Sequence, residues 1–157
     1  MITHIQASVI DIARECGNMA HGCNTQKQMG AGVALQVRLQ FPYAYELYLK
    51  DLTNRDKMHL HTVGDLCYAT ADGQPGVYNL YTQMFPGKWA RAQYVESSFK
   101  LMLEDATKRG ITEIAIPYLI GCGYGGLKES VVMPIITEVM DSFTNIKLII
   151  CELKKPY

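Results

Sequence analysis

Short apolar runs alternate along this chain with longer stretches in which apolar residues recur every three to four positions. The short runs predict β-strands near residues 2–6, 18–23, 63–69, 76–82, 112–117 and 145–153. The longer stretches between them predict helices. Strands that alternate with helices are typical of an α/β fold, with helices on both faces of the sheet. We therefore expect a three-layer α/β/α sandwich around a central mixed, largely parallel sheet.

Glycine and proline mark the expected ends of these helices. The clearest helix is predicted over 91–109, followed by Gly110 at the position of a C-terminal cap. A second, over 129–143, repeats its apolar pattern. An earlier apolar stripe over 33–41 predicts a helix that ends at Pro42, and the same proline can begin another short helix.

Composition places limits on the class of protein. At 157 residues the chain is expected to form a single domain, residues 1–157. Its 15 basic and 15 acidic residues cancel, so nothing in the net charge favours nucleic acid as a partner. The start of the chain does not resemble a signal peptide, and no apolar run is long enough to cross a membrane. We expect a cytoplasmic monomer with a small-molecule ligand.

The cysteines and histidines do not predict a metal site. Five cysteines are scattered without a CxxC pair, which is typical of a reducing compartment. His59 and His61 lie in a charged stretch that offers too few further ligands, so a solvated loop is favoured over a metal site. No cofactor is expected.

Two glycine-rich junctions carry the candidate chemistry. Each runs from a predicted strand through small residues into a helix, the first at 19–34 and the second, IPYLIGCGYGGL, at 116–127. Small residues allow close approach of a ligand, and the N–H groups of a helix N-terminus bind phosphate. The second junction formally contains GxGxxG, but only one strand follows it, and the chain has no GKS or GKT. Two separated loops instead favour a diphosphate held from both sides.

Several motifs together resemble the macrodomain, the ADP-ribose-binding fold, over nearly the whole chain. They are HGCNTQKQMGAGVA at 21–34, FPYAYELY at 41–48, VGDL at 63–66, NLYTQ at 79–83 and the second junction. The resemblance is greatest to the branch of ADP-ribose-1''-phosphate phosphatases and related ADP-ribosyl hydrolases, which includes many phage proteins.

The resemblance implies roles for particular residues. The first diphosphate loop would consist of Met29, Gly30, Ala31, Gly32 and Val33. The second would consist of Ile120, Gly121, Cys122, Gly123 and Tyr124. Asn24 would hydrogen-bond the distal ribose, against which Tyr124 would pack. The adenine would lie near residues 7–10, which include Ser8 and Val9.

The chain departs from the family pattern at three positions. Ser8 occupies the position at which many family members have an aspartate that binds the adenine amino group. Asp11 could make that contact instead, or it could cap a helix. A related branch attacks with a lysine after the fourth strand and uses an aspartate after the second loop. In this chain those positions hold Gln83 and Gly125. We also expect Gln83 to contact the ligand. A covalent lysine–aspartate mechanism is therefore not expected.

Three further features have two interpretations each. His21 ends a predicted strand on the ligand side and is, with Asn24, the candidate catalytic residue, as acid or base; alternatively it is structural. Cys122 is either a reactive thiolate or a small residue in a tight loop, which we favour. The loop 84–91 either forms a rim of the cleft, with Lys88 or Arg91 near a terminal phosphate, or is merely solvated.

The leading hypothesis from the sequence is a protein that binds ADP-ribose and hydrolyses a small derivative of it, the 1''-phosphate. A non-catalytic macrodomain that senses or sequesters ADP-ribose is the first alternative. The second is an ADP-ribosyl hydrolase that acts on modified macromolecules.

Overall fold

The computed structural model describes residues 1–118, 120 and 125–153, and within them six strands form one sheet. The strands are β1 (Ile2–Gln6), β2 (Asn18–Cys23), β3 (Leu66–Ala69), β4 (Gly76–Tyr81), β5 (Glu113–Pro117) and β6 (Lys147–Glu152). They lie in the order β1-β6-β5-β2-β4-β3. Only the β3–β4 pair is antiparallel, so the predicted mixed, largely parallel sheet is confirmed.

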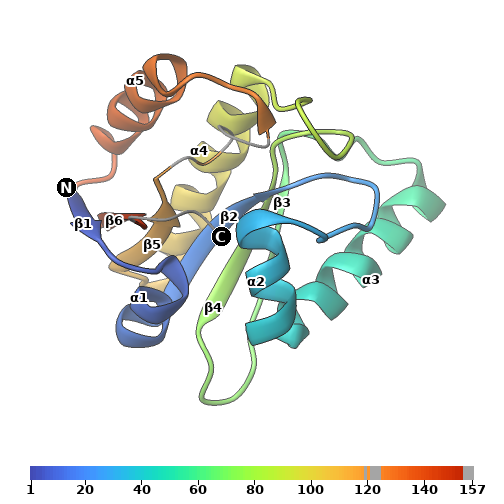
Figure 1. Cartoon of the computed structure of the whole chain (residues 1–157), viewed down its shortest axis with the longest axis horizontal. Coiled ribbons are helices and arrows are strands. Elements are labelled where there is room, and N and C mark those ends of the chain that lie inside the picture. Colours follow the sequence, from blue (N-terminus) through green and yellow to red (C-terminus); the bar gives the residue numbers. More distant parts are fainter. Residues whose placement is uncertain (119, 121–124, 154–157) are drawn as a thin grey trace.

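Helices cover both faces of this sheet (Figure 1). The helices are α1 (Val9–Cys16), α2 (Gly32–Gln40), α3 (Pro42–Met58), α4 (Ala92–Arg109) and α5 (Glu129–Met140). One apolar cluster joins α4 and α5 to the sheet, and a second joins α1, α2 and the start of α3 to its other face. The predicted three-layer sandwich is confirmed.

The sequence pattern explains which strands are central. All six residues of β4 are buried, as expected of a strand with neighbours on both sides and helices above and below. The edge strand β1 has no fully buried residue. Helix α4 ends as predicted, because Gly110 adopts the left-handed conformation (φ 73°) that a C-terminal cap requires.

Two helices differ from the prediction. Helix α1 was not anticipated; its signal was Ser8 followed three residues later by Asp11, a common start of a helix. The Ser8 side chain accepts a hydrogen bond from the Ile10 N–H, so Ser8 and not Asp11 is the cap. Helix α3 is not short but runs to Met58, because its buried stripe continues to Leu52.

No helix in the described part of the chain is long and apolar enough to span a membrane. Within the same residues no group of three or more histidine, cysteine or acidic side chains is placed to hold a metal ion. The four described cysteines are free thiols.

Candidate functional site

The candidate site lies at the edge of the sheet where β2, β4 and β5 end. These strands are parallel neighbours in the order β5-β2-β4, so the segments that follow them emerge side by side. The first glycine junction follows β2 and the second follows β5 (Figure 1). This is the edge at which ligands bind in open α/β sheets.

The first glycine loop combines a buried anchor with an open backbone. Met29 is buried (1% exposed), whereas a Cβ atom added to Gly30 would meet no atom of the described residues within 4 Å. Helix α2 begins at Gly32 (φ 57°), and no side chain of the described residues caps its N-terminus at Ala31. The N–H groups of its first turn therefore remain available to an anion, which the helix dipole also favours. Val33 lies within this first turn.

Most of the predicted second loop, Gly121, Cys122, Gly123 and Tyr124, lies outside the described residues. Ile120, at its start, is a core residue that is 2% exposed. Gly125, just after it, accepts a hydrogen bond from the Ala90 N–H at 3.0 Å. A Cβ atom at Gly125 would lie 2.9 Å from the Cβ of Ala90, so only glycine fits there.

Gln83 and Gly125, the two positions that differ from the lysine–aspartate branch, come together in space. The Gln83 Oε1 lies 3.2 Å from the position that a Cβ of Gly125 would take. The Gln83 amide nitrogen donates to the carbonyls of Phe85 (2.7 Å) and Gly87 (2.9 Å). Gln83 therefore fixes the shape of the loop that follows β4, in addition to any contact with a ligand.

Asn24 has its side chain fixed by its own loop. Its Oδ1 accepts from the Gln26 N–H at 2.9 Å and lies 2.8 Å from the Tyr48 hydroxyl. Its amide nitrogen donates to the Gln28 carbonyl at 2.9 Å. These contacts use one of the two amide hydrogens and leave the second for a ligand. Tyr48 of α3 thus orients Asn24.

His21 lies in the core. It is 1% exposed, and its Nε2 lies 2.6 Å from Oδ1 of Asn79, its neighbour on β4. Burial lowers the pKa of His21 to about 4, so the ring is neutral near pH 7. An acid or base must be within reach of the bond that reacts. The structure favours the structural role that the sequence had left open and gives the ring no exposed surface for a ligand.

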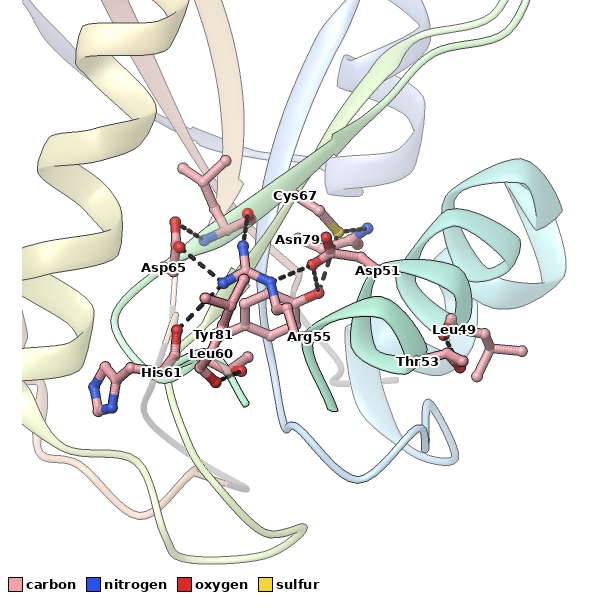
Figure 2. A network of polar contacts seen from close by, with 12 residues as sticks. Leu49, Asp51, Thr53, Arg55, Leu60, His61, Asp65, Cys67, Asn79 and Tyr81 are labelled. Carbon is pink, nitrogen blue, oxygen red and sulfur yellow. Dashed lines mark hydrogen bonds and ion pairs between the residues drawn. The ribbon is translucent and has the colours of Figure 1, made fainter. Parts of the chain in front are cut away.

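A chain of buried polar contacts continues from Asn79 to α3 (Figure 2). The Asn79 amide donates to the Ala44 carbonyl at 3.2 Å and lies 3.4 Å from the Cys67 thiol. The Tyr81 hydroxyl, also 3.4 Å from that thiol, donates to Asp51. Burial raises the pKa of Cys67, so this thiol stays protonated and belongs to the core.

Ser8 and Val9 lie where β1 meets α1, at the same edge of the sheet. The Ser8 side chain caps the helix, and Val9 is buried (2% exposed). The cap interaction explains why serine suits this position. An adenine contact from either residue stays a prediction.

The loop 84–91 is held against both glycine junctions, which the sequence did not reveal. The carbonyl of Met84 accepts two hydrogen bonds from Thr25, from its N–H (3.1 Å) and its hydroxyl (2.8 Å). At the other end of the loop the Ala90 N–H donates a hydrogen bond to the Gly125 carbonyl. The rim position is thus favoured over a free, solvated loop.

The comparisons with known proteins agree with this fold. The family model "Macro domain" matches residues 20–136. A DNA ADP-ribosyl glycohydrolase of Thermus aquaticus is 27% identical over 97% of this chain and 41% of its own length. A DNA ADP-ribosyl transferase–glycohydrolase fusion protein of Thermosipho africanus is 29% identical over 74% of this chain and 34% of its own length. An uncharacterized 17.5 kDa protein of phage T4 is 32% identical over 55% of this chain and 56% of its own length.

Solved structures show the same architecture. The macrodomain of Thermus aquaticus DarG matches with a TM-score of 0.80 at 23% identity, over 99% of both chains. Thermosipho africanus DarTG in complex with ADP-ribose matches with a TM-score of 0.80 at 22% identity, over 98% of this chain and 42% of its own. The chain thus spans less than half the length of the two glycohydrolase relatives. With three quarters of its length inside the family model, the chain belongs to the macrodomain family.

Proposed function

We propose that this macrodomain binds ADP-ribose and hydrolyses the bond that joins ADP-ribose to DNA. The observation that carries the proposal is the first glycine loop. Among the described residues nothing lies within 4 Å of a Cβ built on Gly30, and the N-terminus of α2 carries N–H groups that no described side chain caps. Such a backbone is suited to a diphosphate.

The choice of an ADP-ribosyl bond to DNA rests on the relatives. Both glycohydrolase relatives are named for DNA ADP-ribosyl groups, and one of them aligns with nearly the whole chain. The hydrolysis itself would proceed without a lysine nucleophile at the end of β4, because Gln83 occupies that position. Asn24, with its free amide hydrogen and its fixed side chain, is the described residue that we assign to the distal ribose.

A second candidate is hydrolysis of ADP-ribose-1''-phosphate. Lys88 favours it, because this exposed cation packs beside the second junction: its Cβ lies 2.8 Å from the position that a Cβ of Gly126 would take. A terminal phosphate on the distal ribose would be stabilised by such a charge. The third candidate, a macrodomain that binds ADP-ribose without turnover, is favoured by Gln83.

One set of measurements separates these candidates. Calorimetry with ADP-ribose tests binding, and chromatography tests the release of ADP-ribose from an ADP-ribosylated oligonucleotide and of phosphate from ADP-ribose-1''-phosphate. We expect binding, release from the oligonucleotide, and a loss of at least tenfold in the rate for Asn24→Ala, about 1.4 kcal/mol or more. Binding without any release would favour the non-catalytic protein. No binding at millimolar ADP-ribose would overturn all three.

A further inference from the structure

The loop 84–91 exposes two aromatic side chains beside the candidate site. Phe85 is 41% exposed and Trp89 is 48% exposed, whereas Phe41 and Phe99 are fully buried in the core. The two rings meet edge to face, with centroids 5.3 Å apart and planes at 70°. Two large rings exposed side by side, rather than singly, mark this loop as a candidate contact surface.

Positive charge accompanies these rings. Lys88 is exposed between them in the sequence, and the Arg91 guanidinium lies 5.6 Å from the centre of the Trp89 ring. No aspartate or glutamate occurs between Asp72 and Glu96. Aromatic rings interleaved with cations are the surface on which single-stranded nucleic acids stack their bases and place their phosphates.

The neutral net charge of the chain conceals an uneven distribution. The segments 16–45, 73–95 and 114–128 contain no acidic residue, and they include β2, β4, the part of β5 after Glu113 and the residues that follow these strands. Their basic residues are Lys27, Arg38, Lys88, Arg91 and Lys128, of which Lys27 pairs with Asp56 at 3.6 Å. The neutral net charge of the whole chain therefore does not disfavour nucleic acid at this edge of the sheet.

The loop is fixed relative to the candidate ADP-ribose site. Thr25, in the first junction, binds one end of the loop through the Met84 carbonyl, and Gly125, after the second junction, binds the other end through Ala90. Gln83 holds the turn between them through Phe85 and Gly87. With the distal ribose assigned to Asn24, the residue before Thr25, a polymer attached to that ribose would leave the site beside this loop.

We infer that the loop 84–91 binds the unmodified nucleotides of a single strand next to its ADP-ribose. A base stacks on the Phe85–Trp89 pair, and Lys88 and Arg91 hold the adjacent phosphates. This inference rests on the proposed function for its biological meaning, but the surface itself binds a plain oligonucleotide. Duplex DNA binds poorly, because its bases are already stacked on one another.

The experiment uses the intrinsic fluorescence of Trp89, which is the single tryptophan of the chain. Titration with a 16-nucleotide oligo-dT should quench this fluorescence, and the matching duplex should not. An oligo-U titration distinguishes DNA from RNA as the source of the strand. With two phosphate contacts, affinity should fall about sevenfold between 50 and 200 mM salt.

Variants test the named side chains by anisotropy of a labelled oligo-dT, a signal that does not depend on the tryptophan. Trp89→Ala and Phe85→Ala should each weaken binding by roughly tenfold, the range expected for one stacked base. Lys88→Ala should reduce affinity and flatten the salt dependence. The matched controls are Leu60→Ala, an apolar residue 51% exposed, and Lys100→Ala on the exposed face of α4, which should leave affinity unchanged.

The outcomes separate this inference from the proposed function. ADP-ribose binding in calorimetry with no quenching by any oligonucleotide overturns the inference alone. Quenching by an oligonucleotide without ADP-ribose binding overturns the proposed function and supports the inferred binding of single strands by the loop 84–91. Equal effects of Trp89→Ala and Leu60→Ala on affinity also overturn the inference. So does a dimer that dissociates in Trp89→Ala, because the rings would then form a self-association surface.

Discussion

Gly30 shows how a missing side chain can define a binding site. Its backbone does not need glycine, since Gly30 is absent from the described positions with positive φ, and a Cβ there would contact none of the described residues. We predict that Gly30→Ala weakens ADP-ribose binding and that Gly30→Leu abolishes it. Replacing an unstrained glycine restricts the unfolded chain, so stability should stay equal or rise by about 0.4–1 kcal/mol.

Calorimetry and thermal unfolding of the two Gly30 variants measure both effects on the same samples. The opposite directions of the two effects exclude general damage to the fold as the cause. Full affinity in Gly30→Leu would show that the diphosphate lies elsewhere.

His21 gives a prediction about pH. Its pKa is about 4 in the folded protein, below the ordinary value of 6.5, because burial disfavours the charged ring. The unfolded chain therefore binds a proton first as the pH falls. The contribution of His21 to stability is complete above pH 6.5 and is lost as the pH falls toward 4, by roughly 3 kcal/mol in all.

The measurement is urea unfolding at several pH values between 7.5 and 4.5, with His21→Gln as the matched control, because glutamine keeps a donor for Asn79. The carboxylates titrate in both proteins, so the difference between the two curves isolates His21. Parallel curves would contradict a buried neutral ring. We also expect His21→Gln to retain turnover; a folded variant without turnover would restore His21 as acid or base.

At the scale of elements, Arg55 of α3 links this helix to the start of β3 (Figure 2). Its guanidinium binds Asp51 and Asp65, each at 2.8 Å, and also donates to the Leu66 carbonyl at 3.1 Å. The Arg55 side chain is only 13% exposed. We predict that Arg55→Met lowers the free energy of unfolding by about 2–3 kcal/mol, below the full cost of a broken buried pair because Asp65 is partly solvated.

Urea unfolding measures this loss, and Lys27→Gln serves as its control. The Lys27–Asp56 pair is solvated on both sides and 3.6 Å long, so its loss should cost at most about 0.5 kcal/mol. Similar losses in the two variants would show that burial of the Arg55 network contributes little.

At the scale of the whole molecule we expect a monomer. Each of the five described helices buries apolar residues in one of three core clusters, and the exposed aromatic pair on the loop 84–91 is small. Light scattering should give a mass near 17.6 kDa at every protein concentration tested. A mass that rises with concentration would disprove this.

Much of the fold was predictable because strands and helices leave local periodic signals. All six strands were placed within a few residues, and Gly110 capped α4 as its position indicated. The full length of α3 is not predicted by Pro42, which indicates only where a helix can begin, whereas its buried stripe continues to Leu52. Helix α1 was missed because it is only eight residues long.

The sequence by itself determined the alternation of strands and helices and the position of the first glycine loop before α2. Both follow from local signals, because the spacing of apolar residues and the position of glycines affect the backbone over only a few residues. Tertiary structure alone decided which residues meet. It buried His21 against Asn79, brought Gln83 to Gly125, and tied the aromatic loop to Thr25. These contacts join segments that are tens of residues apart in the sequence. The segments become neighbours through the order of the strands in the sheet, which no local pattern encodes.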